Sequence, residues 1–267
     1  MPQKRNRLTL PADYHSFQSP SVEYRGIFLN DEDWTTQPWS WRTFSPGQPG
    51  MISAKMAGSC GIVIGTSHCQ PMMRNNAGEW NVKERGAYNY LTNKDVVQGY
   101  WKERLEETRQ YENIYTIGMR GIHDGRMEGV GKNLDDQTAA LQQVINDQRL
   151  MLGKHVNKRV EKIPQQFVPY KEVLQVMENG LVVPDDVMLT WCDDNYGYMT
   201  RLSDSLQQKR KGGAGVYYHL SYWGRPHDYL WLSTTQPGLI YNEMHEAYDH
   251  NARRLWIANV HDLKTAA

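Results

Sequence analysis

The 267-residue sequence lacks the features of several large protein classes. Its 30 Lys and Arg balance 30 Asp and Glu, so nothing argues for binding to nucleic acid or to an anionic membrane surface. No apolar run reaches the roughly 18 residues of a membrane-spanning helix. The basic start (MPQKRNRLTLPADY) contains no long apolar segment, so we expect no signal peptide in this chain.

Cysteine and phenylalanine are also scarce. The three cysteines form no CxxC or CxxxC pattern, and Cys60, Cys69 and Cys192 lie in or beside predicted strands. We therefore expect free buried thiols rather than a disulfide. Only four Phe accompany 16 Tyr and nine Trp, whose rings combine an apolar face with a polar group. This composition suits sugar-lined clefts and ordinary half-buried packing equally.

A recurring pattern organises the chain: short runs of strand-forming residues that end in charged or histidine side chains. Residues 24–34 (YRGIFLNDEDW) show it first, and an apolar run of this length predicts a strand buried on both faces. Carboxylates at a strand end are unfavourable in a core and useful in a site. The other runs of this kind cover residues 61–68, 114–124, 166–172, 187–195, 216–223 and 255–262.

Helical patterns separate most of these runs. Thr92 or Asn93 is the predicted N-cap of the first helix. Its apolar positions are Val96, Val97, Tyr100, Trp101 and Leu105. Further helices are predicted at residues 134–152, 171–179, 199–211 and 239–250, whereas residues 35–58 and 70–90 are predicted to be irregular.

The alternation of strands and helices predicts an α/β fold with parallel strands and sites at their carboxyl ends. We expect a TIM-type (β/α) barrel over residues 22–267, preceded by an N-terminal arm at residues 1–21. An open doubly wound sheet is the rival, but no GxGxxG or GxxxxGK[ST] motif follows any strand. Only seven strands are recognisable, so the barrel is predicted to be incomplete.

Eight ordered blocks of sequence make a more specific comparison possible. They are YRGIFLNDEDW, SHCQPMMRNN, YNYLTN, YTIGMRGIHD, PQQFVPYKEVL, WCDDNYGY, YYHLSYWGRPHDYLW and RRLWIANVHD. Together they resemble the catalytic barrel of glycoside hydrolase family 115 over residues 23–262. The resemblance implies hydrolysis, with inversion, of the α-1,2 linkage of (4-O-methyl)-glucuronic acid side chains on glucuronoxylan. It also implies no cofactor, no catalytic metal and, for most members, export from the cell.

The chain departs from the family pattern in several places. Family members are much longer, and they have a helix and another strand between the first strand and the SHC block. Residues 45–60 are too few for that crossover, so strand two is predicted to be missing. Gln70 stands where the resemblance predicts Glu, and Cys192 where it predicts Pro.

Inverting hydrolysis needs one carboxylic acid and one carboxylate about 6.5–9.5 Å apart. We expect Glu172 to be the acid, because partial desolvation near Pro169 and Tyr170 would raise its pKa. Asp124 is the expected base, and Glu32 is the other contender. The structural alternative for Glu172 is a first-turn carboxylate that interacts with the helix dipole.

Other polar residues near strand ends are candidates for sugar binding. They are Asn30, Asp31, His68, Asn75, Asn76, His123, Asp193, Asp194, Asn195, His219, Tyr222, Trp223, Arg225, His227 and Asn259. Arg225 could pair with the uronate carboxylate and Trp223 could stack on a sugar. The structural alternatives are an Asx turn at residues 193–195 and a loop that packs Trp223 and Trp231.

Two other functions compete with the enzyme hypothesis. The missing strand favours an inactive or sugar-binding remnant, because catalytic carboxylates must be held to within about 0.5 Å. A metal-dependent barrel hydrolase would use histidines at the strand ends, but none shows HxH or HExxH spacing. The expected partners are glucuronoxylan or its glucurono-xylooligosaccharides, without nucleic acid or membrane, and a homodimer is kept as an open expectation.

Overall fold

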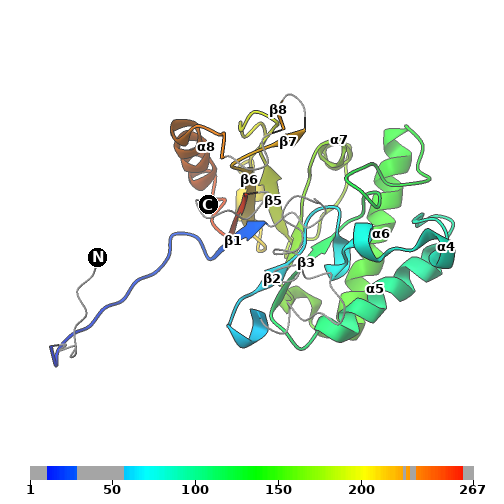
Figure 1. Ribbon diagram of the computed structural model, residues 1–267, viewed down its shortest axis with the longest axis horizontal. Helices are drawn as coiled ribbons and strands as arrows, with labels where there is room; N and C mark the ends of the chain where they lie inside the picture. The colour runs from blue at the N-terminus through cyan, green and yellow to red at the C-terminus, as the bar shows by residue number, and fades with distance from the viewer. Residues whose placement is uncertain (1–10, 29–56, 225–226, 229–232, 261–267) are drawn as a thin grey trace.

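The computed structural model describes residues 11–28, 57–224, 227–228 and 233–260. Its main feature is a curled sheet of seven parallel strands (Figure 1). In spatial order these are β1 (Tyr24–Phe28), β9 (Leu255–Asn259), β6 (Ala214–His219), β5 (Met188–Cys192), β4 (Gln165–Phe167), β3 (Asn113–Ile117) and β2 (Ile64–Gly65). Within the described ranges, β1 and β2 stand at opposite ends of the sheet and do not pair. The fold is therefore an incomplete (β/α) barrel, as the sequence predicted.

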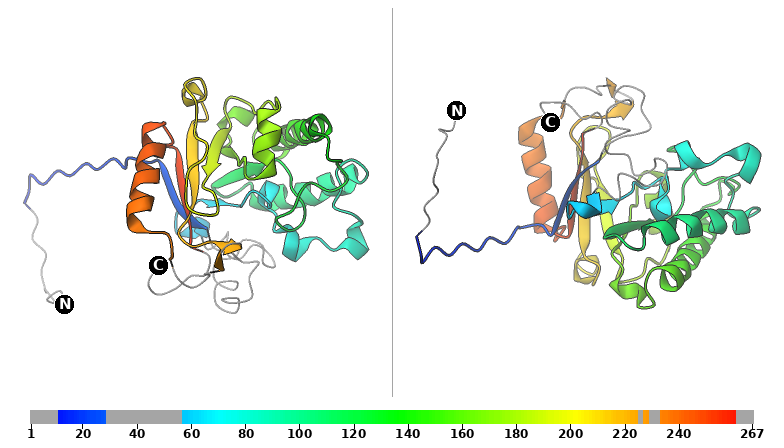
Figure 2. Two further views of the ribbon diagram at one scale, coloured as in Figure 1. Left: turned by 90° about the horizontal axis from the view of Figure 1, so that it is seen from above. Right: turned by 60° about the horizontal axis from the view of Figure 1, so that its bottom comes forward.

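Helices cover the outside of this sheet. The longer ones are α5 (Lys94–Thr108), α6 (Leu134–His155), α7 (Glu172–Glu178) and α8 (Pro237–Asp249). Figure 2 shows α5, α6 and α7 on the side of β3 and β4, while α8 lies near β9 and β1. The short elements are η2 (Pro71–Met73), α3 (Asn76–Glu79), α4 (Val82–Arg85), η3 (Val160–Lys162), η4 (Gln207–Lys209) and the antiparallel pair β7 (Trp223–Gly224) and β8 (His227–Asp228).

Local sequence explains why α6 forms where it does. The Asn133 side chain accepts a hydrogen bond from the Asp135 backbone N–H at 2.8 Å and caps the first turn. Acidic residues lie in that turn and Lys154 and His155 in the last, which complements the helix dipole. The predicted apolar positions Leu141, Val144, Ile145 and Leu152 are buried.

The Tyr and Trp residues supply much of the core. Trp101, Trp191, Tyr88, Tyr90 and Tyr100 are among the largest fully buried side chains. The Tyr90 and Trp101 rings stack with centroids 5.4 Å apart. For these residues the packing interpretation of the composition is correct, and they are not free to line a sugar cleft.

Three local predictions are wrong. Residues 199–211 form no long helix, only η4 at Gln207–Lys209. The segment predicted as irregular after residue 70 contains η2, α3 and α4. Strand β1 is not buried on both faces, because it is the last strand of the described sheet and Ile27 is 56% exposed.

The three cysteines are free, as predicted, although Cys60 is exposed and only Cys69 is fully buried. Residues 11–20 are exposed throughout and lead away from the sheet as an extended arm (Figure 1). Within the described ranges no helix has the length and apolar character needed to cross a bilayer.

Candidate active site

The parallel sheet brings polar side chains to one rim, because the carboxyl ends of parallel strands meet there. His68 follows β2, Asp124 follows β3 and Glu172 follows β4. Asp193 follows β5, and His219 and Asn259 end β6 and β9. Direct contacts join several of these groups, so the sequence prediction of a shared rim agrees with the described structure.

Arg120 is the centre of the carboxylate cluster. Its Nε and Nη2 donate to Oε1 and Oε2 of Glu172 at 2.9 and 2.8 Å, a bidentate pair. Its Nη1 donates to Oδ1 of Asp124. The Arg120 side chain is only 3% exposed, so this guanidinium fixes both carboxylates relative to each other.

The pKa of Glu172 differs from the sequence prediction. Burial disfavours the charged carboxylate, but the hydrogen bonds and the positive charge of Arg120 outweigh burial and lower the pKa of Glu172. The raised pKa predicted from desolvation is therefore wrong, because Arg120 lies against this carboxylate. In the unliganded protein Glu172 is therefore a carboxylate at neutral pH.

His68 lies against Asp124 within an aromatic wall. Its Nε2 donates to Oδ1 of Asp124 at 2.8 Å, and its ring meets those of Tyr170 and Tyr217 edge-on, with centroids 4.7 and 6.2 Å away. Burial, followed by the positive charge of Arg120, lowers the pKa of His68 well below its ordinary value. The imidazole is neutral at pH 7, and its buried Nδ1 has no hydrogen-bond partner within the described structure.

Asp193 has a different role from the one expected. Its side chain is fully buried, and its Oδ1 accepts from Nδ1 of His219 at 2.6 Å. The His219 backbone N–H also points at both Asp193 oxygens, at 3.2 and 3.1 Å. Asp193 therefore orients His219 and does not face a sugar hydroxyl.

Asp194 matches the Asx-turn alternative. Its Oδ1 accepts from the backbone N–H groups of Tyr196 and Tyr198 at 2.8 and 3.0 Å. The loop that this turn stabilises exposes both tyrosines. Asn195, inside the turn, is half-buried.

The remaining rim is lined by hydrogen-bonded aromatic groups. Tyr222 contacts the His219 ring with centroids 5.2 Å apart. Nδ2 of Asn259 donates to the Tyr217 hydroxyl at 2.7 Å. Burial and the nearby Tyr222 raise the pKa of Tyr170, so this phenol stays protonated.

Asn75 and Asn76 are structural rather than sugar-facing. Asn75 caps α3 by accepting from the Gly78 N–H at 3.3 Å, and fully buried Asn76 donates to the Cys69 carbonyl at 2.7 Å. The sequence placed them in a loop because α3 is too short to produce a helical pattern. Their contacts hold the chain that follows His68.

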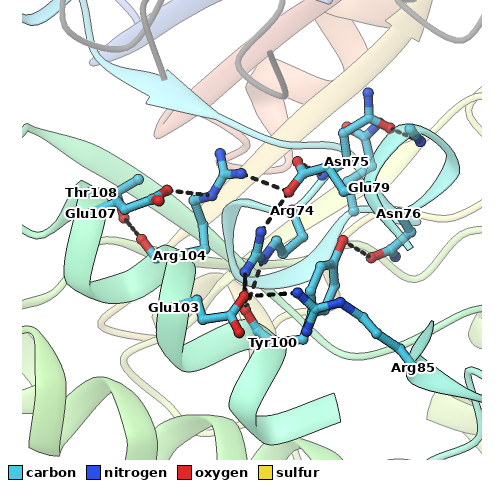
Figure 3. Close-up of polar contacts among 12 residues, drawn as sticks. Arg74, Asn75, Asn76, Glu79, Arg85, Tyr100, Glu103, Arg104, Glu107 and Thr108 are labelled. Atoms are coloured by element: carbon cyan, nitrogen blue, oxygen red, sulfur yellow. Dashed lines mark hydrogen bonds and ion pairs between the residues drawn. The ribbon is translucent and has the colours of Figure 1, made fainter. Parts of the chain in front are cut away.

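A network of charged side chains holds the segment that contains Asn75 and Asn76 (Figure 3). Glu79 accepts from Nη1 of Arg74 and from Nη2 of Arg104, both at 2.6 Å. Arg74 also reaches Glu103 at 2.8 Å and the Tyr100 carbonyl. The network ties η2 and α3 to α5, so the backbone carrying His68 is fixed by a neighbouring helix.

Several predicted site residues cannot be assigned a geometry. Asn30, Asp31, Glu32 and Arg225 lie outside the described residues. Trp223 and His227 are described only as backbone, in β7 and β8. His123 is described and exposed, in the loop between Arg120 and Asp124.

One group of side chains has the composition of a metal site. His68, Cys69 and Asp124 each offer a ligand atom, and these atoms lie within 4.8 Å of one another. Arg120 donates to Asp124, however, and Nζ of Lys171 lies 3.7 Å from it. These two positive charges oppose a cation at that position, so the donor set fits a metal poorly.

Sequence reasoning missed Arg120, Lys171, Tyr170 and Tyr217 as site residues. Arg120 stands four residues before Asp124 in the quoted block YTIGMRGIHD, and Lys171 directly precedes Glu172. The available signal was a cation within four residues of each of these two carboxylates in the sequence.

Comparisons with known proteins identify the family of this chain. The model of glycosyl hydrolase family 115 matches residues 17–53 and 48–267. The chain belongs to glycosyl hydrolase family 115. Family 115 membership accounts for the eight sequence blocks together, and the matched regions include the carboxylate cluster. No curated protein matches the chain.

Among solved structures, the family 115 enzyme BtGH115A is similar over 97% of this chain, with 45% identity and a TM-score of 0.87. It is described as a 4-O-methyl-α-glucuronidase with specificity for decorated arabinogalactans. The alignment covers 39% of BtGH115A, so this chain spans about two fifths of that protein. A 3-keto-D-glucoside 4-epimerase from E. coli, YcjR, matches with 11% identity and a TM-score of 0.38, which is too low to support an argument.

Proposed function

We propose that this chain forms the catalytic barrel of an α-glucuronidase that removes (4-O-methyl)-glucuronic acid side chains from glucuronoxylan. In this proposal the α-1,2 linkage is hydrolysed with inversion. One observation carries it: Asp124 and Glu172, from adjacent strands, are held on different edges of the Arg120 guanidinium. In a family 115 chain, a fixed pair of carboxylates at the strand ends supports glycoside hydrolysis.

Within the pair we assign Glu172 as acid and Asp124 as base, with Glu32 as the other contender for the base. The acid must protonate the leaving oxygen, while the base removes a proton from the attacking water. Because Arg120 lowers the pKa of Glu172, the acid role requires Glu172 to gain a proton when substrate binds. If it does not, the two roles are exchanged.

Sugar contacts are proposed for the polar groups around this pair. His219 is oriented by Asp193 and lies beside Tyr222, so it can bind a sugar hydroxyl at the rim. Arg225 remains a candidate for the uronate carboxylate and Trp223 for stacking. These two assignments rest on the sequence alone.

The purified chain tests the proposal with glucuronoxylan as substrate. Glu172→Gln and Asp124→Asn should each lower kcat by about 10²–10⁴-fold, because general acid and base catalysis contribute that much. Glu178→Gln is the matched control, since Glu178 ends α7 and its side chain is 58% exposed. Proton NMR of the first released sugar should show the β anomer. Equal activity of wild type and Glu172→Gln, or release of the α anomer first, would contradict this mechanism.

A second substrate is favoured by BtGH115A, whose description names decorated arabinogalactans. Parallel assays on glucuronoxylan and on a glucuronate-decorated arabinogalactan decide between them. The inactive or sugar-binding alternative is favoured by the open sheet. Binding of either polysaccharide without any release of glucuronate would support that alternative.

A further inference from the structure

The backbone of Lys171 has a conformation that side chains rarely adopt. Its φ is 51° and its ψ −120°, and the Val173 N–H donates to the Tyr170 carbonyl at 3.1 Å across it. This is the first central position of a type II′ turn, which glycine normally occupies. A lysine here is strained by about 1–3 kcal/mol, and such strain is typical of functional sites.

The strained turn places the lysine at the rim, directly before Glu172. Nζ lies 3.7 Å from Oδ2 of Asp124 and 4.9 Å from the Tyr170 ring centroid. The side chain is 42% exposed, whereas that of Arg120 is 3% exposed and already engages two carboxylates. Lys171 is therefore a cation in contact with this cluster that can still receive an anion from solvent.

Charge balance indicates which anion fits. Within the described residues, Arg120 and Lys171 contribute two positive charges and exposed Arg126 adds another near Glu172, against two negative charges when Asp124 and Glu172 are both ionised. Inverting hydrolysis needs one of the two carboxyls protonated, which increases the excess of positive charge. A uronosyl residue carries one carboxylate that offsets part of this excess, whereas a neutral hexosyl residue does not.

We propose that Lys171 binds the C6 carboxylate of the substrate and so selects uronosyl side chains over neutral sugars. The inference rests on the proposed glucuronidase function and deepens it by adding Lys171, beside the candidate Arg225, as a residue that binds the uronate carboxylate. Lys171 acts as a point charge at this position, beside Asp124.

The test uses Lys171→Met, which removes the ammonium group and keeps an unbranched side chain. Binding of glucuronate and of glucose is measured by calorimetry. The value of kcat/KM is measured on a glucurono-xylooligosaccharide and on its C6 methyl ester. Lys171→Met should weaken glucuronate binding and kcat/KM on the acid by about 10–100-fold, typical of a lost charge-assisted hydrogen bond. The neutral ester and glucose should change less than about threefold by the same reasoning. Lys211→Met is the control, because the Lys211 side chain is 85% exposed and lies 3.9 Å from Asp185.

A second variant distinguishes a structural role of Lys171 from the proposed binding role. Lys171→Gly relieves the strained φ and should raise Tm by about 2–4 °C while losing glucuronate binding as Lys171→Met does. Equal losses of kcat/KM on the acid and on its ester would overturn the inference. So would glucuronate binding that is unchanged in Lys171→Met, or that is absent in the wild type. If the wild type binds glucuronate through Lys171 but releases none from any polysaccharide, the hydrolase proposal fails and this inference stands.

Discussion

At the residue scale, three acidic residues that each follow a strand have different environments. Asp124 is 44% exposed and meets Arg120, His68 and Lys171. Glu172 is 12% exposed and forms a bidentate pair with Arg120. Asp193 is fully buried and bonded to His219. Only the first two carboxylates are therefore placed to react with a bound substrate, while the third acts on its neighbour.

Asp193→Asn should destabilise the protein. The amide leaves a buried N–H of His219 with a weaker acceptor, which costs about 1–3 kcal/mol in free energy of unfolding. Asp194→Asn is the matched control, because an asparagine keeps the acceptor oxygen of the Asx turn; it should cost about 0.5 kcal/mol or less. Urea unfolding measures both, and equal losses would contradict the assigned role of Asp193.

His68 makes stability depend on pH. Its folded-state pKa lies well below the ordinary 6.5, so the unfolded chain binds the proton first as the pH falls. The free energy of unfolding should decrease below about pH 6.5, by up to about 1.4 kcal/mol per pH unit. Glu172, whose pKa is also lowered, loses its contribution at still lower pH.

Urea unfolding between pH 7.5 and 5.5 isolates the histidine. His68→Gln should show a shallower dependence of unfolding free energy on pH than the wild type, because the titrating group is gone. An unchanged slope in this variant would mean that His68 is already protonated or accessible in the folded protein.

At the scale of elements, the segment after β2 depends on its charged support. Met72 and Met73 have φ of 58° and 64° inside η2, and both are buried. Such strained residues persist only where surrounding contacts hold them. The Arg74–Glu79–Arg104 network and the Asn76 bond to Cys69 provide these contacts (Figure 3). A short helix can thus position a rim residue that it does not contain.

Glu79→Gln should destabilise the protein by about 3–5 kcal/mol, because it leaves buried guanidinium groups without their shared carboxylate. The side chains of Arg74 and Arg104 are each only 7% exposed. Glu106→Gln is the control on α5, since the Glu106 side chain is 50% exposed and lies 3.7 Å from Lys102. It should change the free energy of unfolding by about 0.5 kcal/mol or less. Similar losses in both variants would show that the network is solvated.

At the scale of the whole molecule, the sheet is open between β1 and β2 in the described structure. Strands β3 and β6 are fully buried, whereas three of the five residues of β1 are exposed. The rim is nevertheless continuous from β2 through β6 to β9 and β1. Strand direction, and not closure of the barrel, brings the carboxylate cluster together.

Alanine substitutions in a buried strand and in the exposed strand β1 test whether the sheet is open. Ile117→Ala in β3 should cost about 2–5 kcal/mol, because Ile117 is 2% exposed. Ile27→Ala in β1 should cost about 0.5 kcal/mol or less, because Ile27 is 56% exposed. If urea unfolding gave equal losses, β1 would be covered as in a closed barrel.

The sequence by itself determined the order and direction of the strands. Short apolar runs separated by helical patterns admit few arrangements, and the eight blocks by themselves indicate the family. Helices α5, α6, α7 and α8 were predicted to within a few residues because their buried faces repeat at helical spacing.

Only the tertiary structure decided the chemistry of the individual acids. The lowered pKa of Glu172 comes from Arg120, 52 residues earlier in the chain, and buried Asp193 is hydrogen-bonded to His219, 26 residues later. No local pattern records such contacts, because charge and burial depend on what lies nearby in space. Residue type and spacing fix which groups reach the rim, and the fold fixes which of them are paired there.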